Sequence, residues 1–195
     1  MTVETDLRRA RGHLRRELIL RSAVAVIDAR GGGALTHRAA AHQAGVSLAS
    51  VTYHFPSAND LAAATYEWAG RRLLEYIGRA ASWPSVTVQA FPDVVGRVSA
   101  ELAEQRRGEL ITVNHMSMAA ADDDALRDLS AGFRARTTGV FDGYVEDGAS
   151  PLLLAAVNGI LVYSLSNRNV PAEWVAAAVA TLVRKFTLPP GGEPS

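Results

Sequence analysis

The residues best suited to specific chemistry lie in the run LTHRAAAHQAGVSLASVTYHFPSANDL, from Leu35 to Leu61. Between Ser47 and Tyr53, four of seven residues carry a hydroxyl group and none carries a charge. Hydroxyl and methyl groups can contact base edges in a major groove without burying an unpaired charge. This stretch therefore suits sequence-specific contact with DNA.

Two short helices joined by a tight turn would present these side chains. Thr36 can cap a helix that continues to about Ala44, and Ser47 can cap a second one that continues to about Phe55. Gly45 lies at the turn between them, where a positive φ would cost other residues about 1 kcal/mol or more. Ala40, Ala41 and Ala44 are small enough for close approach, and Val46 and Val51 supply apolar contacts. The pattern predicts a helix-turn-helix.

The rest of the chain also has apolar residues at three- and four-residue spacing, which predicts an all-α fold. Trp83-Pro84-Ser85 interrupts this pattern and is expected to join two helical regions. We predict a helix-turn-helix domain over 1–57, a larger helical domain over 58–188 and a disordered tail over 189–195. About nine helices are expected, with the remaining ones over 7–29, 59–81, 92–105, 108–120, 122–146, 151–166 and 171–186.

Composition excludes several classes of protein. Cysteine is absent, which excludes disulfides, thiolate metal sites and cysteine nucleophiles. The polar N-terminal segment lacks the apolar stretch of a signal peptide, and the longest apolar run, 152–162, is too short to span a bilayer. A cytoplasmic protein without membrane contact is expected. Residues 1–60 hold eight arginines and five acidic residues, so a net charge of +3 favours a polyanionic partner at this end.

The run from about Ile19 to Leu61 resembles the DNA-binding domain of TetR-family transcriptional regulators. The spacing of apolar, small and capping residues carries this resemblance. The matching positions are Ile19, Ala23, Gly31–Gly33, Leu35, Thr36, Ala41, Ala44, Gly45, Val46, Ser47, His54, Phe55 and Leu61.

The resemblance implies a set of DNA-contacting residues at the helix starts, on the recognition helix and next to the backbone phosphates. They are Thr36, His37, Arg38, Ser47, Leu48, Ala49, Ser50, Thr52, Tyr53, His54 and Asn59. The sequence departs from the family at Thr52, where a tyrosine is usual, and near Ala58, where a phosphate-binding lysine is missing. Phosphate binding would then fall to Arg38, His54, Asn59 and a flexible arginine-rich arm that holds Arg8, Arg9, Arg11, Arg15 and Arg16.

The resemblance also implies a C-terminal domain that binds a small molecule. Asn114 and His115 are polar groups in an otherwise apolar helix, which makes them candidates for hydrogen bonds to a largely apolar effector. Methionines and aromatic residues at helical spacing are also typical of an ordinary core, and that alternative stays open. The candidate cavity residues are Phe91, Val95, Leu110, Ile111, Asn114, His115, Met116, Met118, Phe133, Phe141 and Tyr144.

The last two helices are apolar on nearly all sides, so they must be buried on several faces. Small residues such as Ala155 and Gly159 would let a second helix approach closely. The resemblance implies a homodimer with a four-helix interface, although burial within one chain explains part of this pattern. The candidate interface residues are Leu153, Ala156, Val157, Ile160, Leu161, Trp174, Val175, Ala178, Val179 and Leu182.

The resemblance implies a regulator that binds a palindromic double-stranded DNA operator as a homodimer. Members of the family mostly repress transcription, so a repressor released by its ligand is expected, and activation stays open as the alternative. Phosphate-loop, dinucleotide and serine-nucleophile motifs are absent from the sequence, so no enzyme activity and no cofactor is expected. No metal is expected either, because no second histidine stands at ligand spacing from His115 and Asp122–Asp124. The alternatives are a helical protein-interaction module that has lost DNA binding, and a small helical enzyme with His115 as its base.

Overall fold

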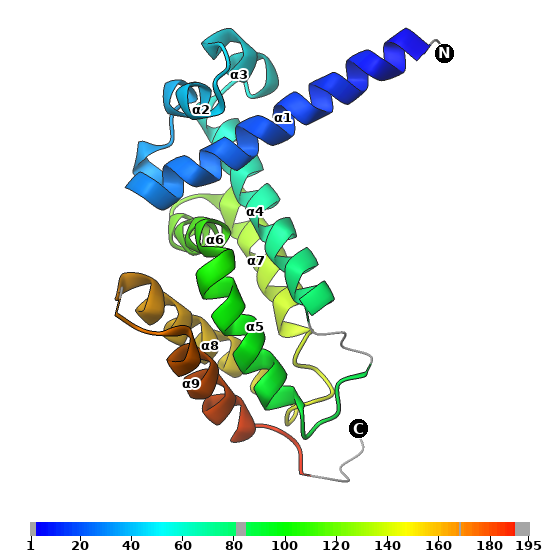
Figure 1. Ribbon diagram of the computed structural model, residues 1–195, viewed down its shortest axis with the longest axis vertical. Helices are drawn as coiled ribbons and strands as arrows, with labels where there is room; N and C mark the ends of the chain where they lie inside the picture. Colours follow the sequence, from blue (N-terminus) through cyan, green and yellow to red (C-terminus); the bar gives the residue numbers. More distant parts are fainter. Residues whose placement is uncertain (1–2, 81–84, 168, 190–195) are drawn as a thin grey trace.

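The computed structural model describes residues 3–80, 85–167 and 169–189, and these residues are almost entirely helical (Figure 1). The predicted all-α class is therefore confirmed. Within the described ranges the only β-type pairing is an isolated bridge between Val145 and Thr187. The helices, in order, are α1 (Val3–Arg30), the 3₁₀ helix η1 (Gly32–Ala34), α2 (His37–Ala44), α3 (Leu48–His54), α4 (Ala58–Ala80), α5 (Phe91–Gln105), α6 (Arg107–Ala119), α7 (Asp124–Thr138), α8 (Ala149–Ser166) and α9 (Ala172–Arg184).

The helix-turn-helix forms where the capping pattern predicts it. The Thr36 side chain accepts a hydrogen bond from the Ala39 amide at 3.0 Å, which caps the start of α2. Gly45 ends α2 in the left-handed conformation, with φ of 64°. The Ser47 side chain then accepts from the Ser50 amide at 3.2 Å and caps α3. Three local signals thus fix the geometry of this short segment.

Two predicted boundaries are wrong. The first helix begins at Val3 rather than Leu7, so the segment expected to be a flexible arm is helical. The helix expected to continue to Glu146 ends at Thr138, because a turn follows that contains Gly143 with a φ of 82°. Most of the predicted joint at Trp83-Pro84-Ser85, and all but the first residue of the predicted tail 189–195, lie outside the described residues.

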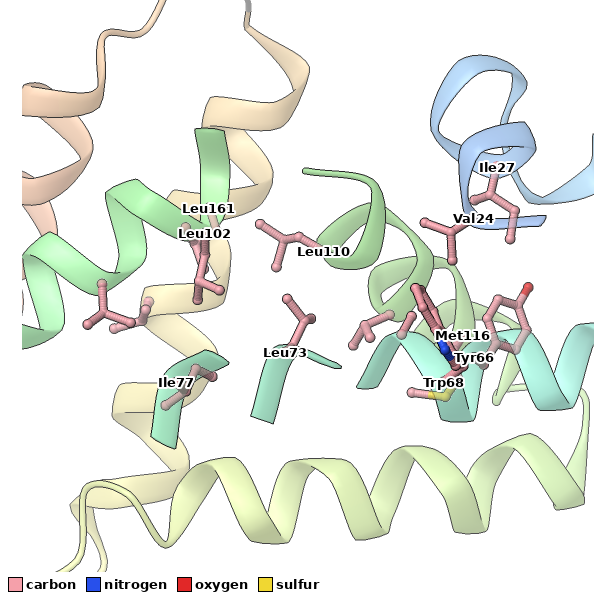
Figure 2. Packing of buried hydrophobic residues seen from close by; sticks show 14 of the residues in the cluster. Val24, Ile27, Tyr66, Trp68, Leu73, Ile77, Leu102, Leu110, Met116 and Leu161 are labelled. Atoms are coloured by element: carbon pink, nitrogen blue, oxygen red, sulfur yellow. The ribbon is translucent and has the colours of Figure 1, made fainter. Parts of the chain in front are cut away.

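The helices place the α2–α3 pair and the α8–α9 pair toward opposite ends of the long axis of the molecule (Figure 1). Helix α4 starts directly after α3 and runs alongside α6 and α7 into the larger helical region. Helix α1 packs on both α2 and α6. Figure 2 shows Val24 and Ile27 of α1 near Met116 and Trp68, all four of which are buried. The helix-turn-helix is therefore held against α4 and α6 by a shared core.

Candidate nucleic-acid interface and effector cavity

Helix α3 presents its polar and methyl-bearing side chains to the outside. Tyr53 is 83% exposed and Leu48 is 42% exposed, so both side chains are accessible on the outer face of α3. The predicted DNA-contacting residues are all exposed or half-buried, so none is enclosed in the core. The Thr52 hydroxyl donates to the backbone carbonyls of Leu48 and Ala49, which holds its side chain along the helix. The outer face of α3 is consequently free for a partner.

The inner face of α3 is held by buried residues and by contacts from neighbouring helices. Val51 and Phe55 are almost completely buried. The His37 imidazole donates through Nε2 to the Phe55 carbonyl oxygen at 2.7 Å, so it connects the start of α2 to the end of α3. The Arg16 guanidinium lies 5.2 Å from the centre of the Phe55 ring, in cation–π geometry. His37 and Arg16 thus help to position α3.

His54 ends α3 in a positive environment. Burial lowers the pKa of the His54 imidazole, and the charges of Arg16 and Arg15 lower it further. The Tyr53 ring contacts the His54 ring edge-on, with centroids 5.2 Å apart. An anion placed next to His54 would oppose this lowering of its pKa.

The start of α4 is fixed next to this face. The Ser57 backbone amide donates to the Asp60 carboxylate at 2.9 Å, and the Asp60 amide donates to the Ser57 hydroxyl at 3.0 Å, as in a capping box. Ala58 and Asn59 are both exposed in the first turn. Because Ala58 has no donor side chain, this turn offers phosphate the Asn59 amide rather than a cationic side chain.

A cavity of about 80 Å³ lies between α4, α5, α6, α7 and α8. Figure 2 shows Leu73, Leu102, Leu110 and Leu161, which arrive from four of these helices. The lining is apolar except for three uncharged polar side chains. The lining residues are Leu73, Ile77, Val95, Val98, Ser99, Leu102, Leu110, Phe133, Thr137, Val140, Phe141, Leu154, Val157, Asn158 and Leu161.

Four of the predicted ligand residues line this cavity, namely Val95, Leu110, Phe133 and Phe141. Two others form an aromatic stack behind it: the Phe91 and Tyr144 rings lie parallel with centroids 4.1 Å apart, and Phe91 also contacts Phe141 edge-on. The remaining predicted residues lie elsewhere on α6, with Met116 in the core and Met118 77% exposed. The predicted residues that do not line the cavity are Phe91, Ile111, Asn114, His115, Met116, Met118 and Tyr144.

Sequence reasoning missed the cavity residues contributed by α4, most of α5, and α8. A signal for α5 was present, because Val95, Val98, Ser99 and Leu102 share one helical face. Asn158 lies within the apolar run 152–162, and its sequence context alone did not assign it to a site. In the structure it donates through Nδ2 to the Asn114 carboxamide oxygen at 3.2 Å, and Asn114 donates to the Leu110 carbonyl at 2.9 Å. Asn114 thus reaches the cavity only through Asn158.

His115 faces the helix-turn-helix rather than the cavity. A Cβ atom added to Gly32 would lie 3.2 Å from His115 Nδ1, which shows how closely the imidazole packs on η1. Leu110, one turn earlier on the same helix, lines the cavity. Within the described residues, no cluster of three or more metal-ligating side chains includes His115 or the nearby aspartates. Helix α6 therefore touches both the cavity and the N-terminal helices α1 and η1.

Helices α8 and α9 carry an apolar outer surface. Leu152 is 60% exposed, Tyr163 52% and Trp174 44%, and the last two rings contact each other at 5.6 Å. Ala155 and Gly159 are exposed between Leu152 and Tyr163, so one face of α8 is unpartnered. By length and composition alone α8 could cross a membrane, with a mean hydropathy of 1.6, but a core helix passes the same test.

The predicted interface residues divide between two environments. Five of them are buried within the chain, because a helix that is apolar all round packs one side on its own fold. These five are Leu153, Val157, Leu161, Val175 and Val179. Ala156, Ile160, Ala178 and Leu182 are half-buried, and Trp174 is exposed. The outer apolar face, defined here as Leu152, Ala155, Gly159, Val162, Tyr163, Trp174 and Ala177, is the surface that remains uncovered.

Solved structures resemble this chain over most of its length. A TetR-family member from Streptomyces coelicolor A3 matches at a TM-score of 0.71 and 24% identity, over 86% of this chain and 97% of that one. A transcriptional regulator from Rhodococcus sp. Rha1 matches at 0.76 and 20%, over 88% and 95%. The multidrug binding protein EbrR with malachite green matches at 0.66 and 25%, over 86% and 97%, and EbrR complexes with ethidium and proflavin also match. No family model and no curated protein sequence matches.

Proposed function

The chain has the fold of the TetR-family transcriptional regulators, and on that premise we propose that it regulates transcription by binding DNA. The observation that carries the proposal is the outer face of α3, where Tyr53 is 83% exposed on a helix whose inner face is fixed in the core. An exposed, uncharged recognition helix set on a rigid scaffold fits a major groove. Arg38 on α2 and Asn59 in the first turn of α4 are both exposed, and we expect them to contact phosphates.

We further propose that the active form is a homodimer that acts as a ligand-released repressor in the cytoplasm. Two copies would join through the outer apolar face of α8 and α9 and present two α3 helices about 34–36 Å apart, one turn of DNA. Such spacing matches a palindromic operator. A small molecule in the cavity would release the DNA by favouring a different spacing.

The position of the cavity supports this proposal. Its walls include Leu73 of α4, the helix that follows directly after α3, and Leu110 of α6, the helix that carries His115 against η1. Movement of either wall would be transmitted to the helix-turn-helix through contacts that are already close. The effect is limited to the difference between the ligand affinities of the two states.

A DNA titration tests the proposal. The intergenic DNA beside the protein's own gene would be labelled and titrated by fluorescence anisotropy at two salt concentrations, with excess unrelated DNA. We expect tight binding that weakens with salt, and a loss of about tenfold or more in Arg38→Ala and in Tyr53→Ala, because each removes a contact to the duplex. Arg79→Ala is the matched control, since Arg79 is an exposed arginine at the far end of α4.

The same titration separates the alternative functions. Binding that unrelated DNA competes away, with Arg38→Ala equal to Arg79→Ala, would contradict the proposal and favour the protein-interaction module. The observation behind that alternative is the first turn of α4, where Ala58 stands near the position of the family's phosphate-binding lysine and the net charge of residues 1–60 is only +3. An enzyme that uses His115 as its base is less suited to the structure, because His115 does not line the cavity.

DNA binding should also depend on pH through His54. Burial and two arginines lower the pKa of His54 in the free protein, whereas a phosphate beside it would raise that pKa. The complex would therefore take up a proton. We expect the affinity for DNA to rise as the pH falls through the pKa of His54 in the complex. The affinity should level off below the pKa of His54 in the free protein. Anisotropy titrations from pH 8 to pH 6 at constant ionic strength would show a smaller rise in His54→Gln, and an unchanged rise would remove His54 from the interface.

A further inference from the structure

The described residues that line the cavity carry no charge, and this restricts the ligands that the cavity can bind. Its lining consists of twelve apolar residues and three uncharged polar ones, and none of these described residues carries an ionisable side chain. An ion placed in an apolar cavity loses its hydration without gaining a partner, which is strongly unfavourable. Cationic dyes such as ethidium and carboxylate-bearing molecules would both meet this penalty.

The polar groups of the lining are few, and one of them is already satisfied. The Thr137 hydroxyl donates to the Phe133 carbonyl oxygen at 2.9 Å. Ser99 is only 4% exposed, and its hydroxyl has no hydrogen-bond partner in the described part of the chain. One end of the Asn158 carboxamide donates to Asn114, while its other end has no partner among the residues that the structure describes. Neither atom is among the fully enclosed unpaired polar atoms of the described residues, so both are open to the cavity or to solvent and can pair with a ligand.

The volume of the cavity sets the size of the ligand. At about 80 Å³ it is smaller than the engineered apolar cavity of about 150 Å³ that binds benzene. A single ring or a short alkyl chain would therefore enter only with a small outward movement of the walls. Leu73 and Leu110 belong to those walls, so this movement would reach α4 and α6.

We propose, on the basis of the regulatory function proposed above, that the cavity takes an uncharged molecule with a small apolar body and one hydrogen-bonding group that contacts Ser99 and Asn158. The apolar body fills the space between the leucine and valine side chains. The polar group satisfies the Ser99 hydroxyl and the free end of the Asn158 carboxamide. Selectivity thus comes from rejection of charge as well as from the fit of the ring.

A matched series of one-ring probes tests this assignment on the full-length protein. Benzyl alcohol, benzylammonium, benzoate and ethylbenzene share a ring and differ in the charge or polarity of the substituent. Dissociation constants would be measured by calorimetry and by chemical-shift titration at millimolar probe concentrations. We expect benzyl alcohol to bind, and benzylammonium and benzoate to bind at least about tenfold more weakly.

Variants of Ser99 and Asn158 test whether these two side chains contact the polar group of the probe. Asn158→Leu and Ser99→Ala should each weaken benzyl alcohol about fivefold relative to ethylbenzene, because the hydrocarbon has no hydrogen bond to lose. Asn169→Leu, an exposed asparagine outside the cavity, is the control and should leave the ratio unchanged. Equal binding of benzylammonium and benzyl alcohol would overturn the proposal, as would an unchanged ratio in both cavity variants or no binding of any probe.

The result of the probe-binding experiment can be interpreted separately from the DNA titration. Probe binding with the expected selectivity in a protein that fails to bind DNA would support the ligand class and remove the regulatory proposal. Specific DNA binding together with equal or absent probe binding would remove the ligand class alone.

Discussion

Gly159→Arg should convert the proposed dimer into a monomer and reduce operator affinity by at least about 100-fold. Gly159 lies at the centre of the outer apolar face, and a Cβ atom added to it meets nothing within 4 Å in the chain itself. The fold therefore has room for the arginine, but a partner helix packed there does not. A twofold interface contains the substitution twice, so two like charges would be buried together at a cost of several kcal/mol.

The measurement is sedimentation velocity at micromolar concentration, followed by the DNA titration. Gly132→Arg is the matched control, because Gly132 is also helical, exposed and without neighbours within 4 Å, but lies on α7. We expect Gly132→Arg to sediment as the wild type does. A Gly159→Arg protein that sediments as the wild type does would exclude this face as the interface, whereas unfolding would be recognised by circular dichroism.

The helix-turn-helix could be predicted from sequence because its determinants are local. Thr36, Gly45 and Ser47 each act on backbone groups within a few residues, and the structure has all three in the predicted roles. The limits of α7 were harder to predict, because nothing in the apolar spacing marks Thr138 as the last residue. The predicted domain boundary between 57 and 58, and the contacts of the predicted DNA-binding residues, remain predictions.

The cavity could be predicted only in part because it depends on how five helices pack. Leu110 and His115 are five residues apart on α6, yet one lines the cavity and the other packs on Gly32. The sequence of α6 alone does not indicate which neighbouring helix each of these residues contacts. Likewise, Val157 was assigned to a dimer interface from an apolar pattern, but it lies inside the chain and lines the cavity. Periodicity identifies that a residue is buried without identifying what covers it.

Gly96→Ala should lower stability, although the same change in an exposed helix usually raises it. A Cβ atom at Gly96 would lie 2.4 Å from the Ala176 carbonyl oxygen and 3.1 Å from the Ala180 Cβ, so α5 and α9 are in backbone contact there. The helices must separate to admit a methyl group, which costs about 1–3 kcal/mol in a packed core. We expect a lower denaturant midpoint in urea unfolding followed by circular dichroism, with a similar slope.

The sign of the change in stability is the informative result, and Gly78→Ala supplies the comparison. Gly78 lies in α4 with nothing within 4 Å of an added Cβ, so alanine there should stabilise the protein by about 0.5–1 kcal/mol through its helix propensity. Opposite signs at the two glycines would mean that α9 is fixed to α5 by close contact. Because Val95 and Ser99 flank Gly96 and line the cavity, Gly96→Ala should also alter probe binding. If both variants gain stability, the close contact between α5 and α9 is absent in solution.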